Sequence, residues 1–119
     1  MPNDNLVVIA AMARKGGNGK TTLSRALISA AVAAGRRVML IDTDSTGVLS
    51  SWHTRATGAG YGSPQLRSSV AGSVGDVDRM IERVYVDGSA DFVFIDTAGV
   101  GAEWSDEIAV LADHIVTPV

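Results

Sequence analysis

The sequence of 119 residues contains no cysteine. Disulfide bonds, zinc sites built on thiolates and iron–sulfur clusters held by cysteine are therefore excluded within it. Positive charge is not in excess either, because the formal net charge is -3. This balance argues against a chain that holds DNA by overall charge alone, although it leaves room for a local basic patch. Aromatic residues make up only 5% and hydrophobic residues 46%, which is a globular composition.

Long hydrophobic runs are also missing. The apolar run at residues 6–13, LVVIAAMA, is far shorter than the ~20 residues that span a bilayer. It ends in an Ala-x-Ala pattern like a signal-peptidase site, but the preceding MPNDN carries an acid and no basic residue. A secretory signal needs a basic start. We therefore expect a buried strand here, and a cytoplasmic protein.

Lysine is scarce as well, with two residues against eight arginines. Both lysines, Lys15 and Lys20, lie in one stretch, RKGGNGKTT at residues 14–22. This stretch departs from the phosphate-loop pattern G-x-x-x-x-G-K-[ST], because Arg14 stands where the first glycine belongs. Chance is one explanation for the two lysines. The chemical explanation is that a slim ammonium fits among phosphate oxygens where a forked guanidinium does not.

The hydrophobic pattern predicts an alternation of strands and helices. Strands are expected at residues 6–12, 37–42 and 91–96 and from residue 114, with an edge strand at 65–70. Helical spacing gives three apolar faces: Leu23, Ala26, Leu27, Ala30, Ala31 and Ala34; Val77, Met80, Ile81 and Val84; and Trp104, Ile108, Leu111 and Ala112. Gly35 and Gly88 are expected to end helices, and Ser73 with Asp76 resembles a capping box.

This alternation predicts the α/β class, with a parallel sheet that carries helices on both faces. At this length we expect one domain over residues 1–119. The last predicted strand begins within a few residues of Val119. The sequence therefore also suggests the N-terminal part of a longer domain, truncated at its C-terminal side.

The glycine-rich stretch stands at the carboxyl end of the first predicted strand, where open parallel sheets bind ligands. Its glycines let backbone N–H groups turn toward phosphate oxygens, and the helix that follows directs its positive end at the same anion. In a phosphate loop Lys20 would reach the β- and γ-phosphates, and the Thr21 hydroxyl would bind Mg²⁺. A glycine-rich turn without a ligand is the simpler alternative.

Carboxylates follow two further predicted strands. Asp42 and Asp44 could face one crevice, where one would orient the shell of Mg²⁺ and the other would hold an attacking water. A polar turn in which an aspartate caps the next helix is the alternative. Asp96, after four apolar residues, fits a Walker B strand whose carboxylate holds Mg²⁺, and residues 97–99 would then lie near the γ-phosphate. Hydrophobic strands that end in aspartate are common, so this motif depends on its position downstream of the loop.

The segments KGGNGKTT, LIDTD and FVFIDTAG together resemble the ParA/MinD family of deviant Walker A P-loop ATPases, and the flanking sequence resembles its ParA branch. In that family an extra lysine, here Lys15, is the defining feature, and the first glycine is not required. The resemblance implies that the loop is an altered nucleotide site. The predicted nucleotide-binding residues are Lys15, Gly16, Gly17, Asn18, Gly19, Lys20, Thr21 and Thr22.

The resemblance also implies a mechanism. Two subunits enclose two ATP molecules, and Lys15 of each subunit reaches the phosphates held by the other, while Gly16 lies where the subunits approach most closely. Asp44 matches the aspartate that positions the attacking water, and Asp42 supports it. The expected catalytic residues are Lys15, Asp44 and Asp42, and the expected metal-binding residues are Thr21, Asp96 and Asp42. After Asp44 the ParA pattern usually continues Pro-Gln, whereas Ser45 and Thr46 follow here.

By resemblance the function is ATP binding and slow, partner-stimulated ATP hydrolysis in plasmid or chromosome partitioning, with ATP and Mg²⁺ as cofactors. The implied partners are a second copy, a ParB-like activator, and DNA bound without sequence preference through a region mostly outside these residues; no membrane is expected. A MinD-like membrane-cycling ATPase would need a C-terminal amphipathic helix, which this sequence lacks. A carrier related to the nitrogenase iron protein would need cysteine. A nucleotide-binding fragment without turnover remains an alternative.

Overall fold

The computed structural model describes residues 4–12, 18–43, 66–97 and 102–116, and of residues 18–24 and 102–105 it describes the backbone. Strands and helices alternate along these ranges, as the hydrophobic pattern predicted. The elements are β1 (Val7–Ala11), α1 (Asn18–Ala33), β2 (Val38–Asp42), β3 (Leu66–Val70), α3 (Val74–Asp87), β4 (Phe92–Asp96), α4 (Ala102–Leu111) and β5 (His114–Val116).

The five strands form one sheet in the order β3-β2-β4-β1-β5, and every neighbouring pair is parallel. β4 therefore lies between β1 and β2, although it follows both in the sequence. β3 pairs with β2 alone within the described residues, so the prediction of an edge strand at 65–70 is confirmed. Because all strands run the same way, the residues that follow β1, β2 and β4 leave the sheet at one edge.

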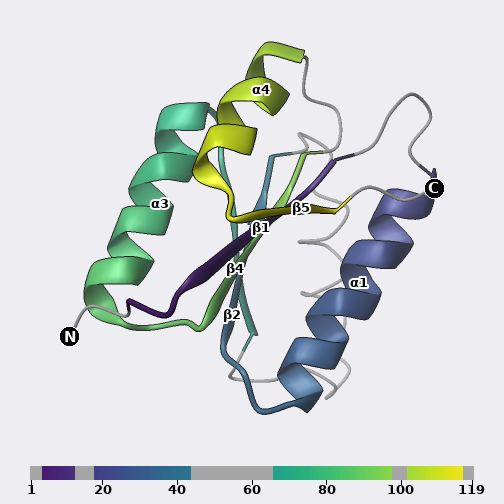
Figure 1. The fold of residues 1–119 in the computed structure, drawn as a ribbon, viewed down its shortest axis with the longest axis vertical. Coiled ribbons are helices and arrows are strands. Elements are labelled where there is room, and N and C mark those ends of the chain that lie inside the picture. The colour runs from purple at the N-terminus through teal and green to yellow at the C-terminus, as the bar shows by residue number, and fades with distance from the viewer. Residues whose placement is uncertain (1–3, 13–17, 44–65, 98–101, 117–119) are drawn as a thin grey trace.

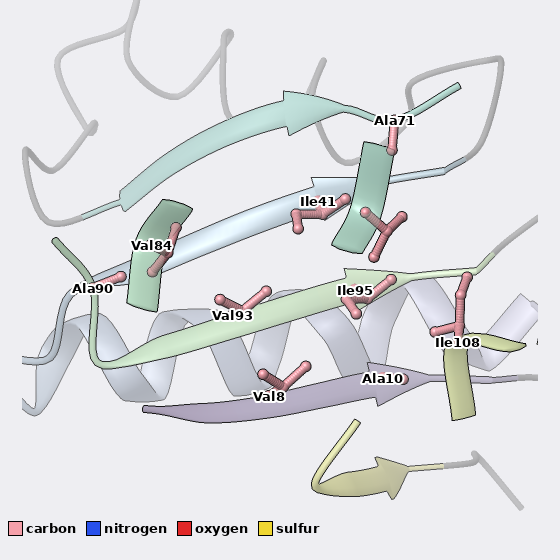
Figure 2. Close-up of a cluster of buried hydrophobic side chains, with 10 residues drawn as sticks. Val8, Ala10, Ile41, Ala71, Val84, Ala90, Val93, Ile95 and Ile108 are labelled. Carbon is pink, nitrogen blue, oxygen red and sulfur yellow. The ribbon is translucent and has the colours of Figure 1, made fainter. Parts of the chain in front are cut away.

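Helices cover both faces of the sheet, as predicted: α3 and α4 pack on one face and α1 on the other (Figure 1). The face under α3 and α4 holds the larger cluster of buried side chains, drawn in Figure 2. Its members are Val8, Ala10, Ile41, Ala71, Val77, Val84, Ala90, Val93, Ile95 and Ile108. The α1 face holds Ala11, Ile28, Val38, Leu40 and Phe94. None of the helices in the described ranges is long and apolar enough to cross a membrane.

The predicted apolar faces of α3 and α4 are confirmed where their side chains are described. On α3, Val77 and Val84 are buried and Met80 and Ile81 pack against the same cluster. On α4, Ile108 is fully buried, with Leu111 and the following Ala112 beside it. On α3 polar residues separate these positions, so the 3.6-residue period marks one face clearly, whereas on α4 the exposed Val110 interrupts the polar side.

The predicted face of α1 was wrong. Ile28 is the buried residue, with Ala31 and Val32 packed beside it, whereas Ala26 and Ala30 are exposed and Leu27 is 36% exposed. The helix is apolar on nearly every side in this stretch, so spacing alone could not choose between two stripes about one residue apart. The large β-branched side chains of Ile28 and Val32 fill more of the space above the sheet than the alanines of the predicted stripe, and burial follows their volume.

Both ends of α3 carry the predicted caps. The Ser73 hydroxyl accepts a hydrogen bond of 3.1 Å from the backbone N–H of Asp76. The Asp76 carboxylate accepts from the N–H of Gly72, one residue before the position that a standard capping box uses. At the other end Gly88 adopts a left-handed conformation with φ 63°, and its N–H donates to the carbonyl of Val84.

We predict that Ser73→Ala lowers the free energy of unfolding by about 1 kcal/mol, because an N–H at the start of α3 loses its acceptor. Chemical denaturation of the purified variant measures this difference. Ser29→Ala in α1 is the control, since Ser29 is exposed inside a helix and alanine is the better helix former. Equal stability of Ser73→Ala and the parent would contradict the capping role.

An ion pair, supported by backbone hydrogen bonds, joins Arg37 before β2 to Asp91 before β4. The Asp91 carboxylate accepts from the backbone N–H of Arg37 at 2.8 Å and from the Arg37 guanidinium at 3.3 Å. In return the carbonyl of Arg37 accepts from the N–H groups of Asp91 and Phe92. The backbone hydrogen bond, followed by the guanidinium, holds the pKa of Asp91 below its ordinary value of 3.8.

Since the folded-state pKa of Asp91 lies below the unfolded value, its carboxylate stabilises the fold above about pH 4, and the effect is lost as the pH falls through the folded-state pKa. We predict that Asp91→Asn destabilises the protein at pH 6 and that the difference from the parent shrinks below pH 4. Urea denaturation across this pH range measures it, with Asp78→Asn on the exposed side of α3 as the control. A difference that stays constant down to pH 2 would contradict this assignment.

Candidate functional site

Two buried carboxylates end neighbouring strands at the same edge of the sheet. Asp42 is the last residue of β2 and Asp96 the last of β4, and they are register partners. Asp96 is in turn the register partner of Ala11, the last residue of β1. The relative exposure is 0% for Asp42 and 1% for Asp96, so both acidic groups are enclosed by protein. The three strands therefore end in one row, Asp42, Asp96 and Ala11.

This row faces α1. Side chains alternate along a strand, and the residues two positions earlier, Leu40 and Phe94, belong to the cluster that packs against Ile28 of α1. The intervening Ile41 and Ile95 belong to the opposite cluster, under α3 and α4. Asp42 and Asp96 thus stand on the side of the sheet that α1 covers, and Ala11 leaves space in the row because its side chain is only a methyl group.

In the sequence, the glycine-rich stretch connects β1 to α1. Lys15, Gly16 and Gly17 lie outside the described residues, whereas the backbone of residues 18–22 forms the beginning of α1. Asn18, Gly19, Lys20, Thr21 and Thr22 therefore occupy the N-terminal end of a helix of 16 residues. The predicted order of strand, glycine-rich segment and helix is therefore present. The free N–H groups and the dipole at the N-terminus of such a helix attract anions.

The structure thus brings together only part of the predicted site. It places Asp42 and Asp96 in register, and it places the backbone of residues 18–22 at the start of α1. Asp44 falls outside the described residues, as do positions 98 and 99 of the loop predicted near the γ-phosphate. The roles of Lys15, Lys20, Thr21 and Asp44 stay predictions.

Two threonines complete the row: Thr43, which the sequence analysis did not single out, and Thr97, which it placed at the start of a loop near the γ-phosphate without predicting its contact. Thr43 follows Asp42, and its hydroxyl donates to the carbonyl of Asp96 at 2.5 Å. Thr97 follows Asp96, and its hydroxyl donates to the carbonyl of Ala11 at 2.7 Å. Both threonines are buried. The signal that could have revealed them is the triplet Ile-Asp-Thr, which occurs at residues 41–43 and again at 95–97.

The chemistry of the row suits a magnesium ion held together with a nucleotide. Mg²⁺ prefers hard oxygen ligands, keeps several waters, and is commonly held by one or two carboxylates plus substrate phosphates. Asp42 and Asp96 supply two such carboxylates at the end of the sheet where α1 begins (Figure 1). Across the described ranges no group of three or more acidic, histidine or cysteine side chains forms a metal cage of its own. The residues present therefore fit Mg²⁺ bound with phosphate, and do not form a closed all-protein metal site.

Solved structures share this fold. A crystal structure of FlhF complexed with GTP and Mg²⁺ has a TM-score of 0.60 and 20% sequence identity over 92% of this chain. A crystal structure of FlhF complexed with GMPPNP and Mg²⁺ has a TM-score of 0.61 and 21% identity over 93% of this chain. The chain spans less than half of either FlhF chain, 42% and 43%. At this identity the likeness shows a P-loop NTPase type of fold.

The sequence itself gives the more specific match. A search of curated proteins finds no significant relative. Residues 9–100, which include the end of β1, the glycine-rich stretch and both aspartate-ended strands, match the CobQ/CobB/MinD/ParA nucleotide binding domain. The match covers more than half of the chain and contains every residue of the predicted site. The chain belongs to the CobQ/CobB/MinD/ParA family of nucleotide-binding domains.

Proposed function

We propose that this chain is an ATP-binding and ATP-hydrolysing dimerisation switch of the ParA type, acting in plasmid or chromosome partitioning. The observation that carries the proposal is the row of Asp42 and Asp96 at the end of the sheet where α1 begins (Figure 1), with the sequence KGGNGKTT spanning the link from β1 and the first residues of that helix. Membership of the family supports nucleotide binding in general. The second lysine and Asp44 support the finer assignment, because they match the residues that distinguish the ParA/MinD ATPases.

In this proposal each residue has a separate task. The ammonium of Lys20 binds the phosphates of the nucleotide in its own subunit, and Lys15 reaches those of the partner. Thr21, Asp96 and Asp42 would hold Mg²⁺, while Asp44, supported by Asp42, would position the attacking water. Magnesium, when bound, neutralises charge on the β- and γ-phosphates. Catalysis then rests on placing charges where the transition state needs them, in a site from which water is largely excluded.

The proposed partners follow from the same assignment. ATP binding would join two subunits, a ParB-like activator would stimulate hydrolysis, and DNA would be bound by the dimer without sequence preference. Two other outcomes remain open to test. A MinD-like protein would bind anionic vesicles in the presence of ATP, and a binding module without turnover would bind ATP and release it unchanged.

The two lysines separate these outcomes. We predict that Lys20→Ala abolishes binding of a fluorescent ATP analogue, because the main cation on the phosphates is lost. Lys15→Ala should leave binding by the monomer nearly unchanged and lower the turnover rate roughly 10³-fold, as loss of a charge supplied in trans does in GTPases. Arg83→Ala, which removes an exposed cation on α3, is the control.

The measurements are equilibrium fluorescence titration, phosphate release and light scattering of the dimer with ATP. If both lysine variants hydrolyse ATP as fast as the parent, the mechanism in trans is wrong. Titration with GTP in place of ATP tests the base preference, since the structurally similar FlhF was crystallised with GTP. Tighter binding of GTP than of ATP would contradict the proposed ATPase.

The buried carboxylate at the end of β4 gives an independent test. We predict that Asp96→Asn keeps the fold, because the amide has nearly the shape of the carboxylate and no buried charge. The variant should weaken the Mg²⁺ dependence of nucleotide binding about 10- to 100-fold, the usual effect of removing a group that orients metal-bound ligands. Titration of Mg²⁺ at fixed nucleotide measures the change, with Asp78→Asn as the control. Unchanged Mg²⁺ dependence would exclude a metal role for Asp96.

A further inference from the structure

Two buried hydroxyl groups tie the ends of three strands together. At the end of β2, Thr43 donates twice to the carbonyl of Asp96, from its backbone N–H at 3.1 Å and from its hydroxyl at 2.5 Å. At the end of β4, Thr97 donates in the same way to the carbonyl of Ala11, from its N–H at 3.3 Å and from its hydroxyl at 2.7 Å. The arrangement at the second strand therefore repeats that at the first.

These contacts lie directly after the last paired residues of the three strands. Regular pairing of β2 with β4 stops at Asp42 and Asp96, and pairing of β4 with β1 stops at Asp96 and Ala11. Beyond those residues, within the part of the chain that the structure describes, the two threonines continue the connection in one direction, from β2 to β4 to β1. The two hydroxyls thus extend the sheet by one residue at the edge where the predicted site residues lie.

The energetics favour a specific role for both hydroxyls. Thr43 and Thr97 are 7% and 6% exposed. A buried hydroxyl needs a hydrogen-bond partner, and a nearly isosteric valine could fill the same volume without that requirement. The carbonyls of Asp96 and Ala11 already accept a backbone N–H each. The added bonds therefore restrict how far the ends of β2 and β4 can turn, and with them the carboxylates of Asp42 and Asp96.

We propose that Thr43 and Thr97 are positioning residues for the nucleotide site: their hydroxyls hold the carboxylates of Asp42 and Asp96 in one row beside the start of α1. This inference rests on the proposed nucleotide-hydrolysing function. It names the hydrogen bonds that fix the positions of the two carboxylates that would hold Mg²⁺. Thr97 links the end of β4 to Ala11, the last residue of β1, which precedes the predicted phosphate loop. Thr43 links the segment that leads to Asp44 to the Walker B strand.

The test uses Thr43→Val and Thr97→Val, which remove the hydroxyl at nearly constant volume, and Thr43→Ser and Thr97→Ser, which keep it. We expect each valine variant to weaken the apparent affinity for Mg²⁺ at fixed ATP analogue about 10-fold, as loss of an outer-shell partner does. The turnover rate should fall while the affinity for nucleotide without metal stays within about twofold, since the phosphate loop is untouched. The serine variants should restore Mg²⁺ affinity.

Ser69→Ala is the matched control. Ser69 lies in the same sheet, on β3, and its hydroxyl has no hydrogen-bond partner among the described residues. Its removal should change neither metal affinity nor turnover. The double variant Thr43→Val with Thr97→Val shows whether the two contacts act as one network, in which case their effects on Mg²⁺ affinity are not additive.

The outcomes are distinct. Valine variants that only lower the unfolding temperature, with Mg²⁺ affinity and turnover unchanged, would overturn the proposal and leave a structural role. Should a valine variant fail to fold, the parent decides: both threonine hydroxyl protons should exchange slowly enough with solvent to be seen by NMR, and fast exchange of either would overturn the proposal. A parent that binds no nucleotide would refute the proposed function, whereas slow hydroxyl exchange in it would still show the strand-end contacts.

Discussion

The register between β2, β4 and β1 is the constraint on which the rest of the structure depends. Backbone pairing sets Asp42 against Asp96 and Asp96 against Ala11, and the alternation of side chains then directs both carboxylates to the α1 face. A shift of either strand by one residue would send its aspartate under α3 and α4, into a cluster of aliphatic side chains. The apolar residues of β2 and β4 therefore fix the position of the polar ones.

The strand order brings the ends of β1, β2 and β4 to one edge of the sheet. Because β4 lies between β1 and β2, the aspartate that ends it is adjacent both to the strand before the phosphate loop and to the strand before Asp44. The segments that meet here are up to 85 residues apart in the sequence, as the pairing of Ala11 with Asp96 shows. Burying carboxylates such as those of Asp42 and Asp96 costs free energy. In the proposed function, a bound Mg²⁺ would offset this cost.

Local patterns made most of the fold predictable. Apolar runs located β1, β2 and β4, and Ser73 and Gly88 located both ends of α3, because these signals act over a few neighbouring residues. The face of α1 was not predictable in this way, since Ile28 and the alanines around it satisfy two stripes equally well. The order of the strands also required the structure, because pairing between β1 and β4 depends on contacts distant in sequence.

The candidate site also has a part that local sequence predicted and a part that only the structure shows. The residue types and their order predicted Asp42 and Asp96 at strand ends, and the general rule for parallel sheets predicted the edge where they lie. The role of residues 14–22 in binding phosphate stays a prediction. The contacts of Thr43 with Asp96 and of Thr97 with Ala11 were not predicted, because a threonine after a strand is unremarkable until the carbonyl it contacts is known. Calorimetric titration of ATP into the protein, with and without Mg²⁺, tests the central claim most directly. The account predicts saturable heat that depends strongly on Mg²⁺, and a folded protein that gives no heat with ATP and Mg²⁺ would contradict it.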